Sequence, residues 1–261
     1  MRAHRLLPLL ATVPLLAVAA APAYAKAPPK STTPTTYDVS YPQCGGALPG
    51  NIDGGIVGVN DGVVLSANPC LATEWAWAQK PTTYAPAFYA NTANPGPAKS
   101  SHWPSGQQTP QVCDGSNSSA CSYDYGWNAA QDSFNDAAAV TATPAAFTWW
   151  LDVETGNSWE TLESVYGQTA QSKANDTAAL QGEVDGLKAL GVTAVGVYST
   201  SYQWGQITGG TGVAFASSPV WVAGTGSLST AQSNCRTASF TGGPIVLAQY
   251  AKSGYDADVH C

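Results

Sequence analysis

The sequence predicts a single α/β domain, a (β/α)8-type TIM-like barrel that is irregular and has fewer helices in its last third. Three observations support this fold. Short β-rich runs alternate with Ala-rich runs of helical composition, which is typical of βαβ units and a parallel sheet. The β-rich runs are almost continuously apolar, as strands buried on both faces are. The segment after the first run, DVSYPQCGG, lacks the glycine fingerprint of a dinucleotide-binding sheet.

Seven segments are predicted to be strands because each is short, apolar and bounded by residues that favour turns. In chain order they are residues 35–41, 54–60, 84–92, 147–155, 194–200, 219–225 and 244–251. Helices are predicted at residues 70–80, 125–142, 177–191 and, more briefly, 200–207. The third helix is expected to end at Gly191, since glycine commonly ends helices in a left-handed conformation. The spacing between strands shortens after this point, so fewer helices are expected there.

The start of the chain is typical of an exported protein. Arg2 and Arg5 precede a Leu/Ala/Val-rich run that ends in Ala23-Tyr24-Ala25, the pattern of a signal peptide. We therefore expect a signal peptide over 1–25, a flexible leader over 26–36 and one barrel domain over 37–261. No later run is apolar for long enough to span a bilayer, so we expect a secreted, extracellular protein without a membrane anchor.

The composition argues against nucleic acid as a partner. The net charge is −7 at pH 7, only 10% of the residues are charged, and the Lys and Arg residues are dispersed. Such a weakly charged, acidic surface suits a monomer that meets uncharged polymers. The nine Trp and twelve Tyr residues include side chains that could stack on sugar rings, although composition alone favours a role in the core.

Six cysteines follow the predicted signal peptide, and an even number in an exported protein favours three disulfides. A zinc site is the alternative, but there is no C-x-x-C pair and only His102 and His260 lie in the same part of the chain. Six cysteines allow 15 pairings. We predict that neighbours in sequence pair: Cys44 with Cys70, Cys113 with Cys121, and Cys235 with Cys261.

Polar residues gather at the carboxyl ends of the predicted strands, where α/β barrels place their active sites. Asp152 and Glu154 are two residues apart near the end of one strand, so their side chains should face the same way. We assign a catalytic role to Glu154, Asp152, Asp38 and Asp258. We assign substrate binding to Tyr41, Tyr89, Asn91, Tyr198, Trp221, Gln249, Tyr250 and Asp256.

A carboxylate cluster at the mouth of an apolar barrel suits glycoside hydrolysis, which needs one protonated carboxyl and one that stays ionised. Glu154 is the longest of these side chains and the furthest toward the mouth, so it is the expected acid. Asp38, Asp152 and Asp258 are its expected ionised partners. As alternatives, a lone D-x-E pair is often structural, Asp38 could cap a turn, and a carboxylate cluster can bind calcium. Calcium loops usually add glycines and carbonyl ligands within one segment, so we predict no metal and no cofactor.

Five segments in order resemble glycoside hydrolase family 25, the lysozyme-like muramidases. They are YDVSYPQ, WWLDVET, GVYSTSYQW, VWVAG and AQYAKSGYDADVH. The resemblance covers nearly all of residues 37–261. It implies an α/β barrel that cleaves the β-1,4 link between N-acetylmuramic acid and N-acetylglucosamine in peptidoglycan, without a cofactor. It places the proton donor on Glu154 and the accompanying acids on Asp38, Asp152 and Asp258.

Two features depart from the family pattern. The sequence DVSYPQCGG places Tyr41 and a cysteine where the family commonly has an aromatic followed by Gln-Gly. The Pro/Ser/Gly-rich insert over 93–124, pinned by Cys113 and Cys121, is not part of the usual pattern and is expected over the active face. These departures leave a second hypothesis open, that of a non-catalytic secreted protein that binds carbohydrate or cell wall on the same barrel. A groove blocked by the insert would favour this second hypothesis.

Overall fold

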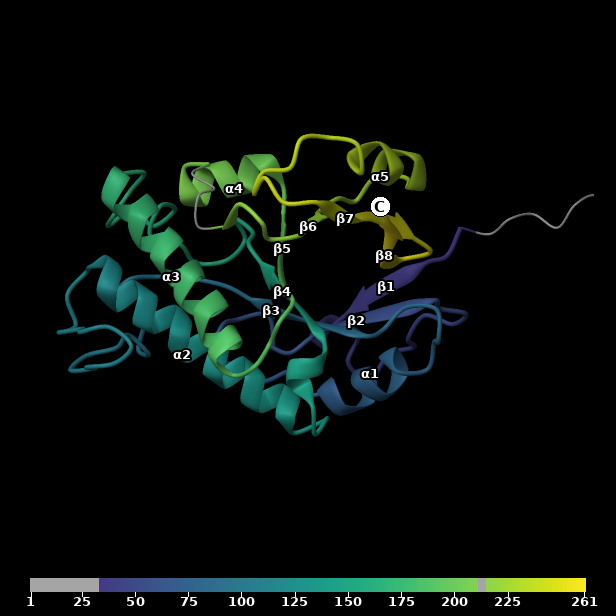
Figure 1. Ribbon diagram of the computed structural model, residues 1–261, viewed down its shortest axis with the longest axis horizontal. Helices are drawn as coiled ribbons and strands as arrows, with labels where there is room; N and C mark the ends of the chain where they lie inside the picture. The colour runs from purple at the N-terminus through teal and green to yellow at the C-terminus, as the bar shows by residue number, and fades with distance from the viewer. Residues whose placement is uncertain (1–32, 211–214) are drawn as a thin grey trace, which may run out of the picture. The chain divides into compact units, whose positions relative to one another are not determined.

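The computed structural model describes residues 33–210 and 215–261, and residues Thr33–Cys261 form one compact unit. The eight strands hydrogen bond in the order β1 to β8 and close a barrel, and Figure 1 shows them around a common centre. The predicted barrel fold is therefore confirmed. The predicted signal peptide lies outside the described residues. The first strand begins at Thr36, which is the last residue of the predicted leader.

All seven predicted strands are present. They are β1 (Thr36–Val39), β2 (Gly54–Gly58), β3 (Ala87–Asn91), β4 (Thr148–Asp152), β5 (Val195–Ser199), β6 (Val220–Val222) and β7 (Ile245–Lys252). Each pairs in parallel with the next one.

An eighth strand, β8 (Tyr255–His260), was not predicted. It runs antiparallel to both β7 and β1 and so closes the barrel. The two residues between β7 and β8, Ser253 and Gly254, both have positive φ angles, of 55° and 84°. Positive φ at both central positions is the geometry of a tight hairpin turn that matches the twist of its strands. Asp256 and Asp258 therefore lie on a strand of the barrel rather than just beyond its last strand.

The helices are α1 (Leu71–Ala78), α2 (Ser119–Ala138), α3 (Ala170–Ala189), α4 (Ser201–Thr208) and α5 (Leu228–Asn234), with short 3-10 turns at Tyr41–Gln43 and Pro144–Ala146. Figure 1 shows α1, α2 and α3 along one side of the barrel and α4 and α5 along the other. No helix in residues 33–210 or 215–261 combines the length and apolarity needed to cross a lipid bilayer.

Helix α2 begins six residues before the predicted start because Ser118 caps it: its hydroxyl accepts a hydrogen bond from the Cys121 amide at 3.3 Å. The loop of the insert therefore ends at Ser118 instead of continuing to residue 124. Helix α2 packs closely on α3. A Cβ atom on Gly126 would lie 1.8 Å from the carbonyl oxygen of Ala179, so only glycine permits this approach.

Successive side chains along each strand point alternately into the barrel and toward the helices, which creates an inner and an outer apolar layer. The inner cluster contains Ile56, Ala87, Trp150, Trp221 and Leu247. The outer core, between strands and helices, contains their sequence neighbours such as Val57, Phe88, Trp149 and Ala248. The neighbours Trp149 and Trp150 thus lie on opposite faces of β4, which is why a strand with this continuous apolar sequence is stable.

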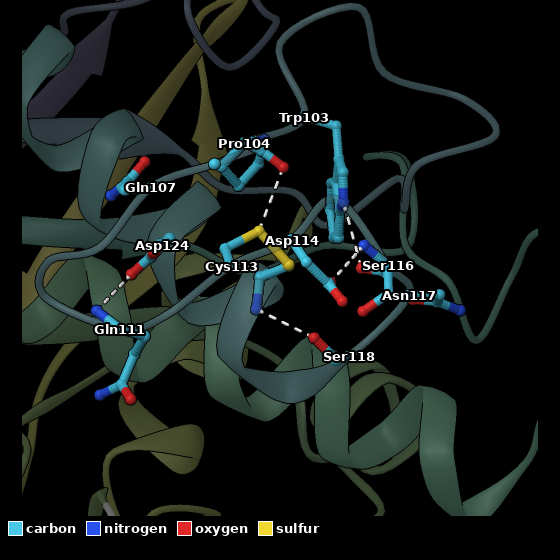
Figure 2. The surroundings of a disulfide bond; sticks show 12 residues. Trp103, Pro104, Gln107, Gln111, Cys113, Asp114, Ser116, Asn117, Ser118 and Asp124 are labelled. Atoms are coloured by element: carbon cyan, nitrogen blue, oxygen red, sulfur yellow. Dashed lines mark hydrogen bonds between the residues drawn. A yellow bond between two sulfur atoms is a disulfide. The ribbon is translucent and has the colours of Figure 1, made fainter.

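All three predicted disulfides are confirmed, linking Cys44 to Cys70, Cys113 to Cys121, and Cys235 to Cys261. The second disulfide joins the insert to the first turn of α2 (Figure 2). The third ties the end of α5 to the residue that follows β8.

Candidate active site

The predicted polar residues lie side by side around the barrel. In the parallel part of the barrel, Asn91 on β3 pairs in register with Asp152 on β4. Asp152 pairs with Tyr198 on β5, and Tyr198 pairs with Trp221 on β6. On the antiparallel side, Gln249 on β7 is opposite Asp258 on β8. Positions in register share a face of the sheet, so these side chains meet inside the barrel.

A hydrogen-bonded chain connects β5, β7 and β1. The hydroxyl of Tyr198 donates to Oε1 of Gln249 at 2.8 Å, and Nε2 of Gln249 donates to Oδ2 of Asp38 at 3.1 Å. The amide of Gly224 also donates to Oε1 of Gln249, at 3.3 Å. Two donors on its oxygen fix the Gln249 amide so that its nitrogen faces the carboxyl group of Asp38.

Asp258 is completely buried, and its Oδ1 accepts a hydrogen bond from the indole of Trp221 at 2.7 Å. Among the described residues, no N–H or O–H group donates to its Oδ2. Burial and the nearby Asp256 charge raise the pKa of Asp38 to about 7. Burial and the Asp38 charge raise the pKa of Asp258 well above its usual value.

Asp152 lies at the end of β4 with only 6% of its surface exposed. Its Oδ2 accepts a hydrogen bond from Nδ2 of Asn91 at 2.7 Å, while its Oδ1 has no partner in the described part of the chain. Burial, followed by the charge of Glu154, raises the pKa of Asp152 well above its usual value. Burial thus favours the protonated form of Asp152 more than in an exposed carboxyl group, and its unpartnered Oδ1 is where a proton can reside.

Glu154 is partly exposed, two residues beyond Asp152. Its Oε1 accepts a hydrogen bond from Nε2 of Gln203 on α4 at 3.3 Å. The backbone amide of Thr155 donates to Oε1 of Gln203 at 2.6 Å and so orients this amide toward Glu154. Trp159 donates its indole N–H to the backbone carbonyl of Glu154 at 2.9 Å. Gln203 and Trp159 hold the acid in place, and sequence reasoning did not single out either residue for this role.

Burial opposes the expected ionisation of Asp152 and Asp258, because it raises the pKa of both carboxyl groups well above the usual value. Both are buried among apolar and aromatic side chains of the barrel interior, and burial disfavours the charged form. The pKa of Asp38 is about 7, so its carboxyl group is protonated below that pH and ionised above it.

Two of the residues predicted to bind substrate lie outside this cluster. Tyr250 belongs to the outer core, because it follows the inward-facing Gln249 in β7 and so points to the opposite face. Tyr41 lies on the short turn after β1 with 42% of its surface exposed, and its ring packs on Gly62. Tyr89 lies at the edge of the inner cluster, with its ring 6.4 Å from that of Trp221. Asp256 is exposed on β8, opposite Asp38.

The insert lines one side of the site and leaves it open. A cavity of about 400 Å³ lies between residues 62–66, the first part of the insert and residues 156–158. Asn91 and Asn157 are part of its wall, and both donate hydrogen bonds to Asp152. Asn91 therefore links the wall of the cavity to the carboxyl group of Asp152, and Asn157 links it to the Asp152 backbone carbonyl.

In the part of the chain that the structure describes, no three His, Cys, Asp or Glu side chains come together in a way that could hold a metal ion. The carboxylates of the site instead find hydrogen-bond donors from amides and an indole.

No protein-family model matches the chain, and no curated protein matches it in sequence. Several solved structures are similar. A muramidase from Trichobolus zukalii aligns with a TM-score of 0.56 and 15% identity over 87% of this chain and 93% of its own. A bacterial lysozyme from Streptomyces coelicolor aligns with a TM-score of 0.54 and 16% identity over 88% and 93%. A family GH25 lysozyme from Aspergillus fumigatus aligns with a TM-score of 0.53 and 13% identity over 88% and 94%. The chain therefore has the barrel fold of the GH25 lysozymes.

Proposed function

We propose that the protein is a secreted glycoside hydrolase that cleaves the β-1,4 link between N-acetylmuramic acid and N-acetylglucosamine in peptidoglycan. The observation that carries the proposal is the convergence of Asp38, Asp152, Glu154 and Asp258 at one end of the barrel interior. The shared fold supports the substrate class, because the similar structures are named as muramidases and lysozymes. The signal-peptide pattern and the three disulfides support export.

Glu154 is the proposed general acid. It is the one catalytic candidate that belongs to a loop beyond its strand, and Gln203 and Thr155 hold it in a partly exposed position that a glycosidic oxygen can reach. Its carboxyl group would donate a proton to the leaving oxygen as the bond to the anomeric carbon breaks.

The buried carboxyl groups have different roles in this proposal. Asp152 is buried beside Glu154 with a pKa raised well above its usual value, and it holds the Asn91 amide in place next to the position of the sugar. Asp38, which is ionised above its pKa of about 7, supplies the negative charge that stabilises the positive charge developing on the sugar in the transition state.

The open cavity beside the cluster counts against the alternative of a non-catalytic binding protein. The insert forms one wall of that cavity and does not fill it. Polysaccharide is the expected partner under either hypothesis.

The test is the release of reducing ends from purified peptidoglycan by residues 26–261 with the disulfides formed. Glu154→Gln keeps the size of the side chain but cannot supply the proton, so its rate should fall by at least about 100-fold. Asp185→Asn, on the outer helix α3, is the matched control and should keep the wild-type rate. If folded wild-type protein releases no reducing ends, or if Glu154→Gln remains fully active, the proposed function is wrong.

A further inference from the structure

The loop after β4 holds the backbone of Glu154 through hydrogen bonds within the loop itself. The Glu154 carbonyl accepts hydrogen bonds from the backbone amide of Asn157 at 3.1 Å and from the indole of Trp159 at 2.9 Å. Trp159 is fully buried, so the protein around it fixes its indole. The position of Glu154 therefore depends on what holds the part of the loop that contains Trp159.

Asp176 on α3 holds the two residues that follow Trp159. Its Oδ1 accepts a hydrogen bond from the backbone amide of Glu160, and its Oδ2 accepts one from the backbone amide of Thr161, both at 3.1 Å. Glu160 and Thr161 lie in a turn and are buried, so their amides need hydrogen-bond partners. The two oxygens of one carboxyl group supply both partners.

Asn94, on the loop after β3, holds the same segment from another side. Its backbone amide donates to the carbonyl of Ser158 at 2.8 Å, and its side-chain amide donates to Oδ1 of Asp176 at 2.9 Å. Asn94 is also fully buried. Trp159 is thus held between Ser158, which bonds to Asn94, and residues 160–161, which bond to Asp176.

This arrangement places two carboxyl groups in the protein interior. Asp176 is completely buried, and burial raises its pKa to about 7. Glu160 is also completely buried, and its carboxyl group accepts hydrogen bonds from the side-chain amides of Asn175 at 3.0 Å and Asn117 at 3.3 Å. Apolar side chains would fill this space at a lower cost in stability. Here every carboxyl oxygen has at least one donor, and such a satisfied network holds the loop in one geometry.

We propose that Asp176 is a positioning residue which, together with Asn94, sets the place of Glu154 by holding residues 158–161. Asp176 is buried and acts through Trp159, so it is not itself a catalytic residue. The inference rests on the proposed function for the role of Glu154 as the acid, but the link from Asp176 to the loop does not require hydrolysis.

Asp176→Asn is the first variant because it keeps the size of the side chain and leaves only one acceptor oxygen. At least one of the two backbone amides then loses its partner. With soluble peptidoglycan fragments as substrate, kcat should fall about tenfold while KM changes little, since the acid is displaced and the sugar contacts are not. Asp185→Asn makes the same change on the same helix, where the side chain bonds to Tyr123 and Gln181, and should leave kcat unchanged.

A double-mutant cycle shows whether the effect passes through Trp159. Trp159→Phe removes the indole donor to the Glu154 carbonyl, so it should also lower kcat. Adding Asp176→Asn to Trp159→Phe should lower kcat by less than about threefold more, because the broken link no longer reaches Glu154 through the indole. If instead the two losses multiply in full, Asp176 does not act through Trp159 and the proposal is overturned.

Hydrogen exchange followed by NMR gives a readout that does not need activity. Asp176→Asn should speed exchange at the backbone amides of Glu160 and Thr161. It should also speed exchange at the Trp159 indole, whereas Asp185→Asn should change none of these rates.

Asn94→Ala removes only a side-chain donor to Asp176 and decides the question if Asp176→Asn does not fold. It should lower kcat at an unchanged KM. Normal kcat in the folded variant, beside an active wild type, overturns the positioning role and leaves the hydrolase standing. If the wild type hydrolyses nothing, the hydrolase is refuted and exchange alone decides: faster exchange at the Trp159 indole supports the link from Asp176 to the loop of Glu154, and unchanged exchange overturns it.

Discussion

Replacing Trp221 with phenylalanine should strongly destabilise the protein because its indole N–H is the one hydrogen-bond donor found for the side chain of Asp258 among the described residues. Both residues are buried, Trp221 with 2% and Asp258 with 0% of its surface exposed. Losing a hydrogen bond to a buried acidic group costs about 1–3 kcal/mol. The change also removes three ring atoms from a packed interior, which costs about 2 kcal/mol at roughly 0.8 kcal/mol for each carbon-sized group.

The free energy of unfolding should therefore fall by about 3–5 kcal/mol for Trp221→Phe. The loss should be at the upper end of this range because the indole of Trp221 packs on other rings of the inner cluster. The ring centroids of Tyr198 and Trp150 lie 4.4 Å and 5.7 Å from that of Trp221. The measurement is guanidinium unfolding followed by far-UV circular dichroism, since tryptophan fluorescence is itself changed by the substitution.

A double-mutant cycle separates the hydrogen bond from the packing. In an Asp258→Ala background there is no acceptor to lose, so Trp221→Phe should cost only its packing share of about 2 kcal/mol or less. The reasoning is refuted if Trp221→Phe costs the same in both backgrounds, or less than about 1 kcal/mol in the wild type.

Two further predictions concern pH and the third disulfide. Burial raises the folded-state pKa of Asp38 and of Asp176 to about 7, so both hold protons that the unfolded chain releases near pH 4. Their contribution to the free energy of unfolding is thus present in full below about pH 4 and is lost as the pH rises through about 7. Denaturant unfolding at a series of pH values should show this decline, and the decline should be smaller in Asp38→Asn. Replacing both Cys235 and Cys261 with serine removes a disulfide that joins residues 26 positions apart. The unfolded chain then gains conformational entropy, so the free energy of unfolding, measured by denaturant titration, should fall by roughly 3–4 kcal/mol. A loss below about 1 kcal/mol would contradict this entropic origin of the stabilisation.

The seven parallel strands could be predicted because each is a compact apolar run bounded by residues that favour turns. The eighth was missed because it is not a continuous apolar run: YDADVH alternates apolar and polar residues, a pattern that fits an antiparallel strand with polar side chains on its inner face. Helix α5 was missed for a related reason. It is seven residues long and buries only Ala231, so it has no apolar periodicity, and the capping hydroxyl of Ser227 is its clearest signal.

The members of the site could largely be predicted from their strand positions, but their protonation could not. The sequence WWLD shows that Asp152 follows an apolar run, yet it does not show that one of its oxygens lacks a donor. Tyr250 was misplaced because the adjacent pair Gln249-Tyr250 gives no sign of which residue faces inward. That choice depends on the pairing of β7 with β8, which brings Gln249 opposite Asp258.

The alternation of inner and outer residues along the strands also constrains how this chain can evolve. A loop such as residues 92–118 can gain or lose residues without moving the carboxyl groups, because its length does not change which face a strand residue occupies. The strands do not tolerate such changes in length. Deleting one residue between Trp149 and Asp152 would turn the acid toward the helices, so inherited variation in length should accumulate in the loops while each strand keeps its count.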